Sequence, residues 1–110
     1  REHATAIGHL AIASGDGATA VGLMTAARSL GEVALGTHTQ DEAPHSTNRF
    51  HPGDAILRVG IGTAARRHDG LRLYKNGTLY LSKPGGQPLI DVQAAIEAKA
   101  SRQGGRGTRG

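Results

Sequence analysis

The sequence predicts an all-β chain: coils of a β-solenoid over the first forty residues, then a β-hairpin and a short C-terminal helix. Three observations lead to this fold class. Alanine, a branched aliphatic residue and glycine recur together every fourteen residues. An Asn-Gly pair separates two aliphatic segments, which is the strongest short signal for a hairpin. Aromatic residues make up 3% of the 110 residues and glycine occurs 17 times, so turns are favoured over a large aromatic core.

The repeat covers residues 1–40. Its strongest positions are an aliphatic residue followed by glycine, namely Ile7, Gly8, Val21, Gly22, Leu35 and Gly36. Fourteen residues are too few for two helices but suit two short strands with tight turns. Alternation along each strand places the aliphatic side chains in one ladder and Ala6, Ala20 and Ala34 in another. Because both ladders are apolar, we expect one to face the interior and the other to meet a neighbouring chain.

Residues 41–53 are polar, contain two prolines and are predicted to form a connector. Residues 54–88 are predicted to form a β-hairpin module, with a strand over 55–59, a loop over 64–70 and a hairpin over 71–82. A two-residue turn at Asn76-Gly77 pairs Tyr74 with Leu79. In that register neither face of the hairpin is polar, so we expect other chains to cover both.

The C-terminal part is predicted to be a short helix or the start of a stalk over 89–101. Asp91 is placed to cap a helix from Val92 to about Ser101, and Leu89, Val92 and Ile96 follow helical spacing. Residues 102–110 are rich in glycine and arginine, which is typical of a disordered tail.

Stability is expected to need help from outside one chain. Apolar residues make up 37% and there is no cysteine, so the remaining sources are a metal, a partner or further copies of the chain. No apolar run approaches the roughly 18 residues of a membrane span, so no membrane insertion is expected. Since the chain does not start with methionine, we expect it to be part of a longer protein.

The repeat resembles the head of YadA-like trimeric adhesins, whose coils carry a (S/T)-(V/A)-A-(I/L/V)-G core. Here this core lies within residues 4–15 and again within 18–27. Residues 57–63, one of Arg66 and Arg67, and residues 73–77 are similar to a segment that follows such heads in phage tail fibres.

The resemblance implies a homotrimeric fibre of left-handed parallel β-rolls followed by interwoven β-strands. It implies attachment of a phage or phage-like particle to a host cell, through a glycan or protein receptor, with other virion or fibre components as partners. The location would then be the virion. Alternatives within this class are a trimeric adhesin head on a bacterial surface and a fibre that decorates a capsid.

Two loops are the candidates for receptor contact, over residues 37–48 and 66–69. The predicted contact residues are Thr37, His38, His45, Asn48, Arg66, Arg67, His68 and Asp69.

No catalytic residues, metal ligands or cofactor are predicted. Residues 60–65 mimic a dinucleotide-binding fingerprint, but an arginine-rich loop and a hairpin follow where a helix is needed. The six histidines show no ligand spacing, although one histidine on a trimer axis could offer three imidazoles to an ion. No serine has a nucleophile context, so we do not expect an enzyme.

The net charge of +4 suggests a different class, a module that binds nucleic acid or another polyanion. Arg66, Arg67 and the arginines of the tail would carry it. No aromatic platform accompanies them, which makes nucleic acid the weaker expectation. Polyanion binding would weaken steeply with salt, whereas an apolar trimer would persist.

Overall fold

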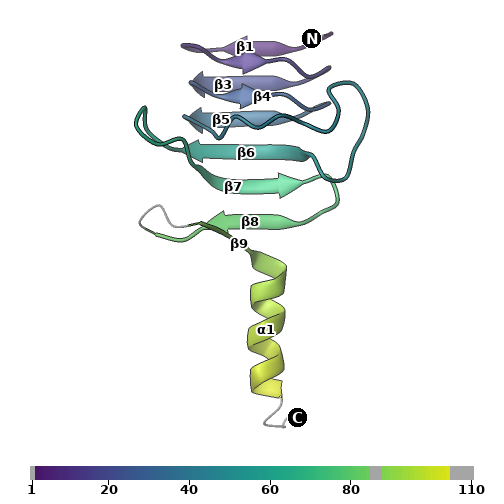
Figure 1. The fold of residues 1–110 in the computed structure, drawn as a ribbon, viewed down its shortest axis with the longest axis vertical. Helices are drawn as coiled ribbons and strands as arrows, with labels where there is room; N and C mark the ends of the chain where they lie inside the picture. The colour runs from purple at the N-terminus through teal and green to yellow at the C-terminus, as the bar shows by residue number, and fades with distance from the viewer. Residues whose placement is uncertain (1, 85–87, 105–110) are drawn as a thin grey trace.

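The chain is mostly β-sheet with one helix at its C-terminal end, as the sequence predicts (Figure 1). The structure is a computed structural model and describes residues 2–84 and 88–104. The molecule is long and thin, with extents of 53 × 31 × 17 Å. The strands lie across the long axis and the helix continues along it (Figure 1).

Two sheets make up the body. The seven-stranded sheet contains, in spatial order, β1 (Thr5–Ile7), β3 (Thr19–Leu23), β5 (Val33–Thr37), β6 (Ala55–Ile61), β7 (Asp69–Tyr74), β8 (Leu79–Ser82) and β9 (Leu89–Asp91). The two-stranded sheet contains β2 (Ile12–Ala13) and β4 (Ala26–Ala27). Helix α1 (Val92–Gly104) follows β9 directly.

The fourteen-residue spacing is the offset between paired residues of neighbouring parallel strands. Ala6 pairs with Ala20, and Ala20 pairs with Ala34. The backbone corners recur at the same spacing, since Leu10, Met24 and His38 have φ values of 57°, 57° and 45°. A left-handed conformation costs an ordinary residue about 1–2 kcal/mol, so its recurrence indicates that each coil bends in the same way.

In the coils of the repeat, alanine side chains form the apolar interior and the larger aliphatic side chains lie outside. Ala18, Ala20, Ala27 and Ala34 are fully buried between the two sheets. Alanine allows the sheets to approach closely because its side chain is one methyl group. The ladder of Ile7, Val21 and Leu35 therefore lies on the opposite face of the larger sheet.

β6 extends the same parallel ladder, so the predicted connector does not separate two sheets. Val33 of β5 pairs with Leu57 of β6, an offset of 24 residues and thus ten more than the repeat. The extra residues form the loop between the two strands (Figure 1). β6 also runs to Ile61, two residues beyond the predicted strand.

The hairpin lies where the sequence predicts it, but the predicted register is wrong. Leu73, not Tyr74, pairs with Leu79, and Arg72 pairs with Tyr80. The loop has three residues, Lys75 to Gly77, because the Tyr74 amide donates to the Thr78 carbonyl at 2.9 Å. A shift of one residue moves side chains to the other face. One face is therefore aliphatic and the other is polar, in contrast to the predicted pair of apolar faces.

Three boundaries also differ from the prediction. Asp69 begins β7 and does not lie in a loop. Leu89 lies in β9, so its spacing to Val92 does not belong to a helix.

The Asp91 cap is confirmed, since the Ala94 amide donates to Asp91 Oδ1 at 3.0 Å. The helix runs to Gly104, so residues 102–104 are not part of a disordered tail, and residues 105–110 lie outside the described residues.

Candidate functional site

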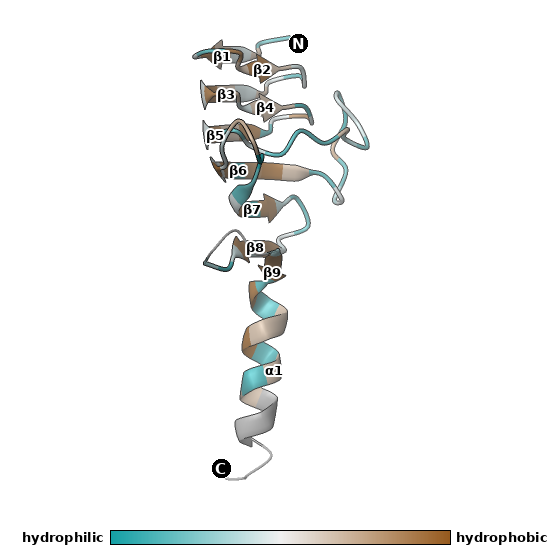
Figure 2. Ribbon diagram, turned by 60° about the vertical axis from the view of Figure 1, so that its left-hand side comes forward, coloured by the Kyte–Doolittle hydropathy of each residue, from teal (hydrophilic) through white to brown (hydrophobic). Residues whose placement is uncertain are grey.

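The main candidate is an apolar face that runs across all seven strands of the larger sheet. Residues that pair in register project to the same face, so the alternation can be followed from strand to strand. This apolar face consists of Ile7, Val21, Leu23, Val33, Leu35, Leu57, Val59, Ile61, Leu71, Leu73, Leu79, Leu81 and Ile90. Figure 2 shows hydrophobic residues concentrated on the strands and hydrophilic residues in the loops.

The apolar face is open to solvent in the single chain. Ile7 is 59% exposed and Ile61 56% exposed, and Leu23, Leu35, Leu81 and Ile90 are also exposed. A pocket of about 440 Å³ lies on this face, lined by Val59, Ile61, Leu71 and Pro84 among others. Scattered exposed aliphatic residues are ordinary, whereas aliphatic residues in register across seven strands make this face a candidate interaction surface.

Covering the apolar face would release substantial free energy. Full burial of one Val, Leu or Ile side chain is worth about 1.5–3 kcal/mol. For a half-exposed side chain the remaining gain is about 1 kcal/mol, and the gain repeats along the sheet. Contact with another apolar surface would therefore stabilise this face.

The opposite face of the same sheet holds a buried cluster of two arginines and two carboxylates, Glu32, Arg58, Asp69 and Arg72. Asp69 Oδ2 accepts from Arg58 Nη1 at 2.9 Å and from Arg72 Nε at 2.8 Å. Arg58 Nε donates to Glu32 Oε2 at 2.5 Å. Burial lowers the pKa of Arg58, but the charges of Glu32 and Asp69 outweigh it, so its pKa is raised overall.

A β-bulge explains why Asp69 joins this cluster. Val59 pairs with Leu71 but Gly60 pairs with Asp69, so Gly70 is an extra residue on β7. A bulge changes the direction of the side chains beyond it. It turns Asp69 away from the apolar face and toward Arg58 and Arg72. The cluster holds β6 and β7 together and has the character of a structural ion-pair network.

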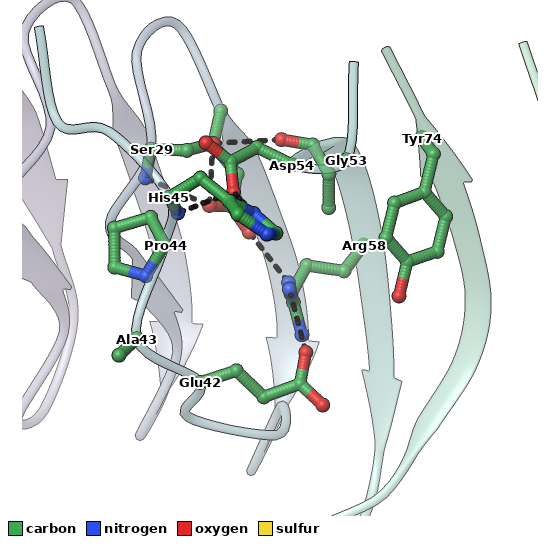
Figure 3. A pocket seen from close by; sticks show the side chains of 11 residues that line it. Ser29, Glu42, Ala43, Pro44, His45, Gly53, Asp54, Arg58 and Tyr74 are labelled. Atoms are coloured by element: carbon green, nitrogen blue, oxygen red, sulfur yellow. Dashed lines mark hydrogen bonds and ion pairs between the residues drawn. The ribbon is translucent and has the colours of Figure 1, made fainter. Parts of the chain in front are cut away.

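A polar pocket of about 350 Å³ lies beside this cluster (Figure 3). Glu42, His45, Arg58 and Tyr74 are among its lining residues. In Figure 3 the carboxylate of Glu42 lies next to the guanidinium of Arg58, and Asp54 lies against His45. The Arg58 Nη2 to Glu42 Oε1 distance is 3.3 Å. The pocket presents charged groups that already have partners within the chain.

The structure brings one group of the predicted contact residues together. Thr37, His38, Arg66, Arg67 and His68 meet at one end of the strands, where the His68 amide donates to the His38 carbonyl at 3.0 Å. Arg67 Nε donates to the Thr39 carbonyl at 2.8 Å, which ties the loop to the repeat. Thr37 and Arg66 are exposed.

Asp69, His38 and His68 are buried, so their side chains do not present a surface to a receptor. Asp69 is the clearest correction because its exposure is 0% and both arginines bind it. His68 Nε2 lies 2.7 Å from Ser82 Oγ. For these three residues the structure replaces the predicted contact role with a role in packing.

His45 and Asn48 lie on the loop between β5 and β6, and the His45 amide donates to Asp54 beside the start of β6, which is the other end of that strand. His45 and Asn48 are both exposed. Burial raises the pKa of Asp54. Hydrogen bonds from the backbone and ring of His45 and from the Ser46 amide lower it by more, so the pKa is below its usual range. The predicted contact residues therefore form two separate surfaces.

The sequence alone does not reveal that Glu32 binds Arg58, that Asp69 binds Arg72, or that His45 and His51 are neighbours. Glu32 and Asp69 are 37 positions apart, so only the fold brings them together. The sequence does carry one signal for a buried ion-pair cluster. An arginine in the middle of an aliphatic strand, as at Arg58 and Arg72, requires a carboxylate nearby when it is buried.

Comparison with known proteins gives no relative: no family model, no curated protein and no solved structure matches the chain. Among residues 2–84 and 88–104, no helix has the length and apolarity needed to cross a membrane.

Proposed function

We propose that the chain is a segment of a homotrimeric fibre of a phage or phage-like particle and that it mediates attachment to a host cell surface. The observation that carries this proposal is the apolar face, which extends across every strand of the larger sheet and is left in solvent by one chain. A thin molecule with one apolar side along its length is suited to side-by-side association around a common axis.

The finer description of the fold belongs to the same proposal. Parallel strands at a fourteen-residue offset are in keeping with a β-roll of the adhesin-head type, which the motifs of residues 4–15 and 18–27 resemble. Three chains would bring three apolar faces together. The loops at the strand ends would then be repeated three times, so that weak receptor contacts act together.

Surface candidates for the receptor are Thr37, Arg66 and Arg67 at one end and His45 and Asn48 at the other. The partner is a glycan or protein of the host surface, and the proposal assigns no catalytic step to the chain. A bacterial trimeric adhesin head and a capsid-decorating fibre use the same architecture, so they remain the alternatives within this class.

Molar mass in solution, measured by light scattering after size exclusion, tests the assembly. The chain mass is 11.3 kDa. A trimer gives three times 11.3 kDa, about 34 kDa. A mass of one chain at micromolar concentration, with the protein folded by circular dichroism, would refute the proposal.

A matched pair of variants locates the interface. Ile7→Glu and Ile61→Glu place a carboxylate on the apolar face and should reduce the mass to that of one chain. Ile12→Glu is the control, because Ile12 is 41% exposed on β2, outside the larger sheet. If Ile12→Glu dissociates the assembly and Ile61→Glu does not, the interface lies on the other side of the molecule.

The polyanion-binding alternative rests on the exposed Arg66 and the basic C-terminal residues. Retention on a heparin column in increasing salt separates the two classes. Early elution in moderate salt, together with an unchanged trimer mass in 1 M NaCl, would favour the fibre, since that salt is about seven times physiological ionic strength. Tight salt-dependent binding that disappears with residues 102–110 would favour the alternative.

A further inference from the structure

Two histidines and an aspartate meet on the loop that precedes β6. One donor atom each from His45, His51 and Asp54 lies within 4.8 Å of the others. All three belong to the segment that makes the β5–β6 connection ten residues longer than a coil of the repeat. This cluster is separate from the apolar face, and all of its residues come from one chain.

The carboxylate of Asp54 is held in place by the loop. Its side chain is 3% exposed. Oδ1 accepts from the His45 amide at 2.7 Å, and Oδ2 accepts from the Ser46 amide at 3.0 Å. The Asp54 amide in turn donates to the His51 carbonyl at 3.0 Å. A carboxylate that is oriented in advance loses little freedom when it binds a cation.

The two imidazoles lie against each other beside this carboxylate. Their rings are parallel within 1° and their centroids are 4.1 Å apart. Gly53 permits this approach, because a Cβ there would lie 3.1 Å from His45 Cε1 and 3.2 Å from His51 Cε1.

The spacing of the donors suits one ion after a small side-chain movement. His45 Nδ1 and Asp54 Oδ1 are 3.0 Å apart, in a hydrogen-bonding contact that a bound ion would replace. Two ligands at about 2.1 Å from an ion are separated by about 3.0 Å at right angles and by about 3.4 Å in the tetrahedral geometry of Zn²⁺. Parallel rings do not direct their lone pairs at one point, so one imidazole must rotate. His45 has space to do so because its side chain is 59% exposed.

We propose that His45, His51 and Asp54 form a binding site for a divalent transition-metal ion such as Zn²⁺ or Ni²⁺. Two imidazoles and one carboxylate favour these ions over Ca²⁺ and Mg²⁺, which prefer oxygen ligands. Water would complete the coordination. The bound ion ties the long β5–β6 loop to the start of β6.

Lys75 should weaken the binding of a metal ion at this site. Its Nζ is buried without a hydrogen-bond partner, and it interacts electrostatically with Asp54. An ammonium group near the site opposes the charge of a second cation. Lys75→Met should therefore tighten metal binding relative to the unaltered chain.

Calorimetric titration of the tag-free protein with ZnCl₂ and NiCl₂ at pH 7.5 tests the site. We expect saturable binding of one ion per chain. His45→Ala and His51→Ala should each weaken it about tenfold or more, the scale of losing a metal-site group. His9→Ala is the matched control because His9 is exposed in a turn of the first coil.

A second readout is the thermal midpoint, which should rise with ZnCl₂ in the unaltered chain and not in His45→Ala. The proposal is overturned if no saturable binding occurs with the folded protein, if both histidine variants bind as the unaltered chain does, or if His9→Ala abolishes binding. Because no second chain contributes a ligand, these outcomes are independent of the trimer mass.

Discussion

Replacement of Gly22 by alanine tests the close packing of neighbouring coils. Gly22 has φ +133°, and an added Cβ would lie 2.1 Å from the carbonyl oxygen of Gly36. A non-bonded carbon–oxygen contact is about 3.3 Å, so β3 and β5 would have to separate by about 1 Å. Such a shift takes hydrogen bonds out of their usual range of about 2.7–3.2 Å.

The size of the effect follows from the length of the ladder. β3 has five residues, all paired with β5, and each hydrogen bond contributes about 1 kcal/mol net. Loss of several bonds, with the strain of a positive φ, gives a destabilisation of about 3–5 kcal/mol. That is a large part of the roughly 5–15 kcal/mol that stabilises a typical domain.

Gly17→Ala is the matched control. Gly17 also has a positive φ, 68°, but nothing lies within 4 Å of an added Cβ. Only the conformational cost of about 1–2 kcal/mol should appear. The assay is urea unfolding followed by circular dichroism, with all variants at one protein concentration because association adds to stability. Equal losses for the two variants would refute the reasoning that adjacent coils touch through their glycines.

Three further predictions concern stability. Asp69→Asn should lower the free energy of unfolding in urea by about 3–5 kcal/mol, because Arg58 stays buried with one counter-charge fewer. Glu42→Gln, at the exposed edge of the cluster, should lower it by less than about 1 kcal/mol. Similar losses for the two variants would mean that the cluster is not desolvated. Folding lowers the pKa of Asp54, so ionised Asp54 stabilises the folded state. This stabilisation is complete above about pH 4, the pKa in the unfolded chain, and is lost as the pH falls through the lower pKa of the folded chain. The urea midpoint should therefore drop more between pH 6 and pH 2.5 in the unaltered chain than in Asp54→Asn, and a parallel drop would contradict this. Gly77→Ala should cost about 1 kcal/mol in the same assay, since φ is +93° and an added Cβ has free space; an unchanged midpoint would argue against a left-handed residue in the turn.

The register of the first strands could be predicted because the same types of residue recur at a fixed spacing. Ala6 pairs with Ala20 and Ala20 pairs with Ala34, as an offset of fourteen requires. The cap at Asp91 was also predictable, since it depends on neighbours along the chain. Signals of this kind are local or periodic, so they can be read without knowledge of the fold.

The hairpin register shows the limit of such signals. Asn76-Gly77 correctly marks a turn, but a turn of two or three residues can contain the same pair. The choice between them decides whether Tyr74 or Leu73 faces Leu79. The sheet resolves it, because β6 already presents Leu57 beside Leu73 and so selects the face on which the leucines gather.

The amino-acid sequence alone was sufficient to establish the coil spacing, the strand-rich composition and the positions of the main turns, because these depend on periodicity and on residues close along the chain. The tertiary structure was needed to decide that alanines fill the interior, that a bulge at Gly70 turns Asp69 toward Arg58, and that His45 meets His51. Each of these depends on which surfaces approach in space. Two apolar ladders of one strand look equally suited to burial until the second sheet covers one of them.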